Sequence, residues 1–128
     1  MSTKTEEELT TYYTNKYPLT FTEDFSEADT DLTRRYQEAW ELAKRSAALL
    51  KKSFGAKKVV VFGSLAKRSW FTRWSDVDLA AWGVPNDKFY AAVGAVTGLT
   101  TDFKVDLVDV GECRDSLRKA IEAEGIEI

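Results

Sequence analysis

One apolar stripe constrains the fold more than any other feature of the sequence. From residue 32 onward, apolar side chains recur at spacings of 4, 4, 3, 4, 3 and 4, at Leu32, Tyr36, Trp40, Ala43, Ala47, Leu50 and Phe54. This periodicity predicts an amphipathic helix with one continuous apolar face. Asp29, Thr30 or Asp31 can cap its start, and Gly55 stands where a helix-terminating glycine belongs. We therefore expect a long helix to open the folded domain, which is assigned to residues 31–128.

Strands and shorter helices alternate after this helix. Runs rich in β-branched residues predict strands at Lys58–Phe62, Val77–Trp82 and Phe103–Val110, and a short terminal strand at Ile126–Ile128. Two further helices are expected, from Asn86 to about Val96 and from Arg114 to Ala123. The predicted fold class is α/β (α+β), with a small mixed sheet flanked by helices. Residues 1–30 are expected to form an N-terminal arm, with one short helix at Glu6–Asn15.

The composition narrows the chemistry and the partners. The 128 residues fit one domain, and a net charge of −3 argues against direct, sequence-blind binding of nucleic acid. Histidine is absent, which removes the commonest general base and the commonest zinc ligand. The lone Cys113 cannot form an internal disulfide. Because no signal peptide or membrane-spanning run is recognisable, we expect a cytoplasmic protein that does not enter the membrane.

Two carboxylates stand one residue apart at the start of the second strand, in the segment SDVDLA. Since strand side chains alternate between faces, Asp76 and Asp78 are expected to point the same way, while Val77 and Leu79 face the core. Two carboxylates on one face repel each other unless they are far apart, protonated or bound to a cation. A divalent metal such as Mg²⁺, which prefers oxygen ligands and substrate phosphates, is the efficient solution.

The third strand, FKVDLVDV, supplies a further carboxylate. Asp106 lies in mid-strand among apolar residues, where an unpaired charge is expensive. Asp109 lies on the opposite face and close to the strand end. We therefore expect Asp106 to be the third metal ligand, and it can also serve as the base that accepts a hydroxyl proton.

A Gly-Ser corner follows the first strand, in the segment VFGSLAK. Gly63 lets the backbone approach a phosphate closely, and Ser64 offers a hydroxyl and a free backbone N–H at the corner. Lys67 and Arg68 lie just beyond and can neutralise a triphosphate. Each of these features alone is ordinary, as a turn, a solvated strand start, an edge charge or a basic loop. The combination of the Gly-Ser corner, the paired acids and the third acid along three successive strands favours a functional site.

These motifs resemble those of the nucleotidyltransferases of the DNA polymerase β superfamily, and most closely the minimal nucleotidyltransferase (MNT) proteins. The resemblance rests on VVVFGSLAK, SDVDLA and KVDLVDV, with a similar C-terminal LRKAIEAEGIEI, and covers about Leu42 to Ile128. It implies the polymerase β-like nucleotidyltransferase fold. Two departures are visible, because Arg68 stands where these proteins commonly carry glycine and the spacer before Asp76 is longer than usual.

The resemblance also implies a role for each residue of the motif. The residues implied to contact the nucleotide are Gly63, Ser64, Lys67, Arg68 and Ser75. The residues implied to be catalytic and to bind metal, as two Mg²⁺ ions with ATP as substrate, are Asp76, Asp78 and Asp106.

MNT proteins of this size are typically antitoxins encoded beside a HEPN-domain ribonuclease toxin. The resemblance implies that this chain transfers AMP from ATP to a tyrosine of such a toxin and silences it. Two alternatives stay open. The chain can be a non-catalytic antitoxin that neutralises its partner by binding, or a nucleotidyltransferase acting on a small hydroxylated molecule.

Aromatic residues outside the stripe bear on the partner. The residues expected at the surface, either packed locally or forming a protein-binding patch, are Tyr12, Tyr13, Tyr17, Trp70, Phe71 and Trp74. Trp40 and Trp82 are assigned to packing against the core.

Overall fold

The computed structural model describes the secondary structure of residues 22–128 and the side chains of residues 30–128. The short helix predicted at Glu6–Asn15, and the tyrosines of the predicted arm, lie outside these residues. In the part described, the elements follow the predicted order. They are α2 (Thr22–Ser53), β1 (Lys58–Phe62), the 3-10 turns η2 (Gly63–Ala66) and η3 (Arg68–Trp70), β2 (Val77–Trp82), α3 (Asn86–Thr97), β3 (Val105–Asp109), α4 (Asp115–Glu124) and β4 (Ile126–Glu127).

The four strands form one mixed sheet in the order β3-β2-β1-β4. β1 pairs antiparallel with both β2 and β4, whereas β2 and β3 run parallel. The parallel pair requires a crossover, and α3 makes it. As a result β2 and β3 begin at the same edge of the sheet, which brings their first residues together.

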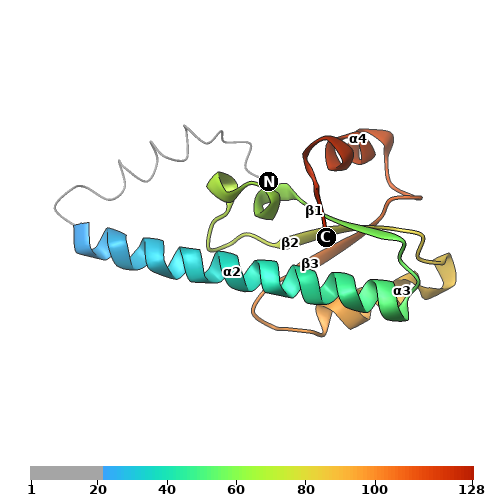
Figure 1. Ribbon diagram of the computed structural model, residues 1–128, viewed down its shortest axis with the longest axis horizontal. Coiled ribbons are helices and arrows are strands. Elements are labelled where there is room, and N and C mark those ends of the chain that lie inside the picture. Colours follow the sequence, from blue (N-terminus) through green and yellow to red (C-terminus); the bar gives the residue numbers. More distant parts are fainter. Residues whose placement is uncertain (1–21) are drawn as a thin grey trace.

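Helices cover both faces of the sheet, with α2 along one side and α4 on the other (Figure 1). The larger core lies between α2, α3 and one sheet face, and includes Leu42, Leu50, Val61, Leu79 and Val105. A smaller cluster on the opposite face joins Ile121 of α4 to Val60, Ala80 and Val110. This two-sided burial explains the continuous apolar runs of β1 and β2. The α/β class with a small mixed sheet is confirmed.

The predicted start of the long helix is wrong. α2 begins at Thr22, not near Asp31, and the expected capping residues lie inside it. The segment from Thr22 to Ser53 contains neither glycine nor proline, so nothing in the local sequence interrupts the helix there. Part of the predicted arm, residues 22–30, is therefore helical. The division into an arm at 1–30 and a domain at 31–128 stays a prediction.

Element ends elsewhere differ from prediction by one or two residues. Asn86 is the first residue of α3 and Pro85, with φ −58°, precedes it as the N-cap. Proline just ahead of a helix suits the fixed φ of its ring. Gly55 has φ +75°, as expected for a glycine that ends a helix. Within residues 22–128 no helix is both long and apolar enough to span a membrane.

Candidate active site

The three predicted acids lie on one face of the sheet, at the edge where β2 and β3 begin. Asp78 is directly opposite Asp106 in the parallel register, and Val77 is opposite Val105. Because side chains alternate, Asp76, Asp78 and Asp106 all point to the face that carries α4. The strand register thus brings the three acidic positions together.

The electrostatics of Asp78 show how closely these carboxylates interact. Its pKa is raised from 3.8 to about 6, chiefly because burial disfavours the charged form, and then because of the negative charges of Asp106 and Asp76. Lys104 acts in the opposite direction and lowers the pKa. Asp78 is therefore the carboxylate on which the site concentrates its unfavourable charge.

Gly63 contacts this same carboxylate. It has φ +72°, in the region that favours glycine, and a Cβ added there would lie 2.5 Å from Asp78 Oδ2. Two independent constraints, backbone conformation and space, therefore require glycine at the corner. The predicted phosphate-binding corner lies directly beside the predicted metal-binding acids.

The two serines of the predicted site differ in their surroundings. Ser64 is buried and is the second residue of the 3-10 turn η2, which follows β1 directly. The Ser75 Oγ accepts a hydrogen bond of 2.8 Å from the Thr72 backbone N–H, so this hydroxyl closes the turn just before Asp76. Ser75 thereby fixes the entry of the chain into β2.

The two basic residues after the corner contact other elements. Lys67 Nζ lies 3.4 Å from Glu124 Oε1 at the end of α4 and 4.3 Å from the centroid of the Trp70 ring. Arg68 donates a hydrogen bond of 3.3 Å to Thr33 Oγ1 and lies over the Tyr36 ring. Arg68 is thus directed to α2 and anchors the loop to that helix.

Sequence reasoning missed Lys104. Its Nζ is 3.9 Å from Asp106 Oδ1, and its backbone carbonyl accepts the N–H of Val77 at 2.9 Å. Lys104 lies two residues before Asp106, so strand alternation could have placed it on the acidic face. It is a cation at the site that comes from the residue just before β3 rather than from the Gly-Ser corner.

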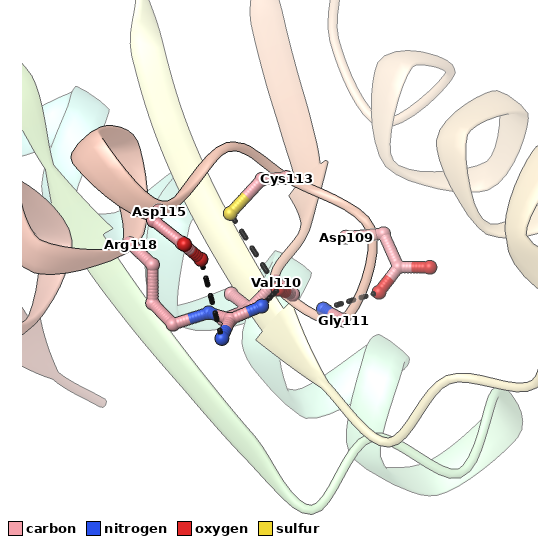
Figure 2. Close-up of polar contacts among 6 residues, drawn as sticks. All are labelled: Asp109, Val110, Gly111, Cys113, Asp115 and Arg118. Atoms are coloured by element: carbon pink, nitrogen blue, oxygen red, sulfur yellow. Dashed lines mark hydrogen bonds and ion pairs between the residues drawn. The ribbon is translucent and has the colours of Figure 1, made fainter.

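Asp109, which was not predicted to bind metal, has a different local partner. Its Oδ1 accepts the backbone N–H of Gly111 at 3.0 Å in the turn after β3 (Figure 2). The same turn is held from α4, because Arg118 donates to the Val110 carbonyl at 3.0 Å. Asp109 therefore shapes the far end of β3, whereas Asp106 lies beside Asp78.

The donor set fits a hard divalent cation, since carboxylate oxygens are the ligands that Mg²⁺ prefers. Among residues 30–128, however, no three His, Cys, Asp or Glu side chains form a ready-made metal cluster. The backbone positions and the raised pKa of Asp78 are those of a site that gains from a bound cation.

The surface aromatics only partly follow prediction. Phe71 was expected at the surface, but it is buried because its ring packs edge-on against Tyr36 of α2, with centroids 5.3 Å apart. Trp74 is 77% exposed, as predicted, and Trp70 is half-buried. Trp40 and Trp82 pack against the two core clusters, as predicted.

Comparison with known proteins gives a structural likeness without a sequence match. No protein-family model matches the chain, and no curated protein matches it. Three solved structures are similar over about two thirds of the chain. A toxin–antitoxin with AMP-PNP matches with a TM-score of 0.57 at 21% identity, covering 66% of this chain and 70% of that one. The toxin–antitoxin MntA–HepT matches with a TM-score of 0.52 at 18% identity, covering 69% of both chains.

A third structure is a mutant of the toxin–antitoxin MntA–HpeT in which two aspartates, two positions apart, are replaced by glutamate. It has a TM-score of 0.55 at 19% identity and covers 66% of this chain and 70% of that chain. At these identities the likeness concerns the fold. The predicted fold is confirmed by these matches and by the sheet topology.

Proposed function

We propose that this chain is a metal-dependent nucleotidyltransferase that moves AMP from ATP to a tyrosine hydroxyl of a HEPN-type toxin, and so acts as an antitoxin. Support comes from neighbours that are toxin–antitoxin structures, one of them with AMP-PNP. Further support comes from the site. The phosphates of a nucleotide need a neutralising cation, which the acids could hold, and a backbone that they can approach closely, which Gly63 provides.

The observation that carries the proposal is the contact between the two halves of the motif. Gly63 directly follows β1 and Asp78 lies in β2, yet no side chain fits between the Gly63 Cα and the Asp78 carboxylate. Asp106 is directly opposite Asp78. A phosphate at the corner and a cation at the acids would therefore be immediate neighbours, which is the requirement for phosphoryl-type transfer.

Each residue has a distinct part in the transfer. The backbone at Gly63 and Ser64 holds the phosphates of ATP at the end of β1. Asp106 accepts the proton of the tyrosine hydroxyl while the tyrosine oxygen forms a bond to the α-phosphorus. The bond from the α-phosphorus to the oxygen bridging the α- and β-phosphates breaks, and pyrophosphate leaves with that oxygen.

Asp76, Asp78 and Asp106 would hold the divalent ions, with two Mg²⁺ expected. When bound, Mg²⁺ neutralises the developing charge on the phosphate oxygens. Asp78, with its pKa near 6, is largely ionised at neutral pH and is the group that gains most from a neighbouring cation.

The direct test is transfer of label from α-labelled ATP to the co-expressed toxin protein, with mass spectrometry of its tyrosines. Asp76→Asn and Asp78→Asn are each expected to reduce transfer by at least about a hundredfold, since each removes an anionic metal ligand. The matched control is Asp87→Asn in the first turn of α3, which should transfer normally. Retained transfer in both site variants would refute the assignment.

Neutralisation by binding alone is the second candidate, and one observation favours it. Lys104 already provides a positive partner for Asp106, so the third acid is partly compensated within the chain. In that case Asp76→Asn would abolish nothing, and growth protection against the toxin would persist. The transferase function predicts instead that Asp76→Asn loses growth protection while the protein stays folded.

A further inference from the structure

A short, tightly hydrogen-bonded turn connects the loop after η3 to the acid pair. Within Thr72–Ser75, the Ser75 backbone N–H donates to the Thr72 carbonyl at 3.1 Å. The Thr72 backbone N–H donates to Ser75 Oγ at 2.8 Å, and the Trp74 backbone N–H donates to Thr72 Oγ1 at 3.2 Å. Together with the contact of 3.3 Å between the Thr72 and Ser75 hydroxyls, these hydrogen bonds define the turn. Its central residues, Arg73 and Trp74, point outward.

The turn is also anchored from behind. Phe71 immediately precedes it, is 2% exposed, and packs on Tyr36 of α2. Arg68 lies over the same Tyr36 ring at 4.8 Å from its centroid. The base of the loop is thus fixed to α2, while Trp74 remains 77% exposed. A rigid backbone that presents an exposed indole lowers the entropic cost of binding and is typical of an interface anchor.

The loop that precedes Asp76 carries only basic charged residues. Residues 63–75 contain Lys67, Arg68 and Arg73 and no acidic residue, in a chain with a net charge of −3. Lys67 is bound to Glu124, and Arg68 is held on α2. Arg73 is exposed, and its guanidinium lies 5.9 Å from the centroid of the Trp74 ring. The exposed feature is therefore one aromatic side chain with one cation beside it.

We infer that the Arg73–Trp74 turn is the docking point for the acceptor protein, and that it binds an acidic segment close to the accepting hydroxyl. Trp74 lies two residues before Asp76, so a segment seated on the indole passes along the edge of the acidic site. The guanidinium of Arg73 pairs with a carboxylate of that segment, and the indole covers its apolar neighbour. This inference rests on the proposed function only in taking the acceptor to be a protein.

An acidic protein segment fits this surface better than single-stranded nucleic acid does. A nucleic-acid strand needs a row of cations along its backbone and several stacking side chains. Here two of the three basic residues of the loop have partners on α2 and α4. The exposed pair of Arg73 and Trp74 fits a contact with one short protein segment better than a contact along an extended nucleic-acid strand.

The experiment measures binding separately from transfer. The full chain is titrated at low salt with a synthetic peptide that carries one tyrosine flanked by glutamates, and with the same peptide flanked by lysines. Tryptophan fluorescence and calorimetry report binding, and the variants are Trp74→Ala and Arg73→Gln. The matched control is Tyr90→Ala, since Tyr90 on α3 is 87% exposed but lies elsewhere on the fold.

Binding of the glutamate peptide is expected to weaken by at least about tenfold in Trp74→Ala and several-fold in Arg73→Gln, and to stay unchanged in Tyr90→Ala. The lysine peptide should not bind. Equal binding by Trp74→Ala and the wild type would overturn the inference. So would a single-stranded oligoadenylate that binds better than the peptide and depends on Trp74.

Failure of the proposed function looks different in the same experiment. Asp76→Asn should bind the glutamate peptide normally and transfer nothing, while Trp74→Ala should raise the KM for the peptide with kcat preserved. If no variant and no wild-type sample transfers AMP but peptide binding still depends on Trp74, the transferase function fails and the docking site stands.

Discussion

Replacing Asp78 by asparagine is expected to stabilise the metal-free protein at neutral pH. The folded environment raises the pKa of Asp78 from 3.8 to about 6, so the folded state disfavours the ionised carboxylate. A difference of about two pH units is worth roughly 3 kcal/mol for a fully buried group. Because this carboxyl is partly exposed, water screening reduces the figure to about 1–2 kcal/mol. Asparagine keeps the shape and removes the charge.

The sign of this effect depends on pH in a defined way. Well below pH 3.8 the carboxyl is protonated in both the folded and the unfolded chain, so wild type and Asp78→Asn should be equally stable. Between about pH 4 and 6 the unfolded chain releases the proton first, and the wild type loses stability as pH rises. Above about pH 6 the full difference is present.

The assay is thermal and urea unfolding in EDTA at pH 3.5 and pH 7.5. At pH 7.5 the variant should gain about 1–2 kcal/mol, which corresponds to a Tm increase of roughly 4–8 °C for a domain of this size. At pH 3.5, where the carboxyl is mostly protonated in the unfolded chain as well, the two curves should nearly coincide. The control Glu122→Gln removes an exposed carboxylate on α4 and should leave stability unchanged. A variant that is less stable than the wild type at pH 7.5, or a control with the same gain, would refute the electrostatic reasoning.

Further outcomes are expected for the charged neighbours of Asp78 and for three glycines. Asp106→Asn should lower the pKa of Asp78 and Lys104→Met should raise it, since Asp106 and Lys104 are charged neighbours of Asp78. Carbon-13 NMR titration of the Asp78 carboxyl measures both shifts, and an unchanged pKa in both variants would contradict the geometry. Gly63→Ala should destabilise the fold by about 1–3 kcal/mol, because residue 63 has a positive φ and the added Cβ would collide with Asp78 Oδ2. The same variant should abolish ATP binding in calorimetry, and unchanged ATP affinity would show that the Gly63 corner does not bind the nucleotide. Gly125→Ala should cost about 2–4 kcal/mol in urea unfolding, because its Cβ would overlap Val60 and lie 2.5 Å from the Ile121 carbonyl oxygen. Gly94→Ala, with open space around it in α3, should instead gain about 0.5–1 kcal/mol, and the reverse ranking of the two glycine variants would contradict the packing.

The regular elements could be predicted from local patterns because the patterns themselves produce them. The apolar stripe of α2 and the β-branched runs of β1 and β2 are periodic signals that survive in any tertiary context. The shared face of Asp76 and Asp78 follows from alternation alone. The start of α2 at Thr22 was missed because Asp and Thr are preferred at helix N-caps but are also tolerated inside a helix, as they are here.

Features that depend on which segments become neighbours are absent from local patterns. The burial of Phe71 depends on Tyr36, which is far away in sequence and on another element. The opposition of Asp78 and Asp106 requires β2 and β3 to be adjacent, parallel and in one particular register. Asp106 could be predicted for a different reason, because an unpaired charge in the middle of a strand is unfavourable. The strand pairing then shows that this charge lies opposite Asp78.

The unfavourable negative charge of the site falls mainly on Asp78, so cation binding at this residue should also stabilise the fold. Asp78 lies between Gly63, Asp76 and Asp106, and it is the group whose pKa is raised to about 6. A sequence selected for stability alone would place a neutral residue there, so the retained carboxylate marks a position where function outweighs local consistency. Because a bound cation would remove the repulsion at Asp78 first, added Mg²⁺ should stabilise the wild type and leave Asp78→Asn nearly unchanged. Asp78, whose ionised form the fold disfavours, is thus the residue through which cation binding would stabilise the protein.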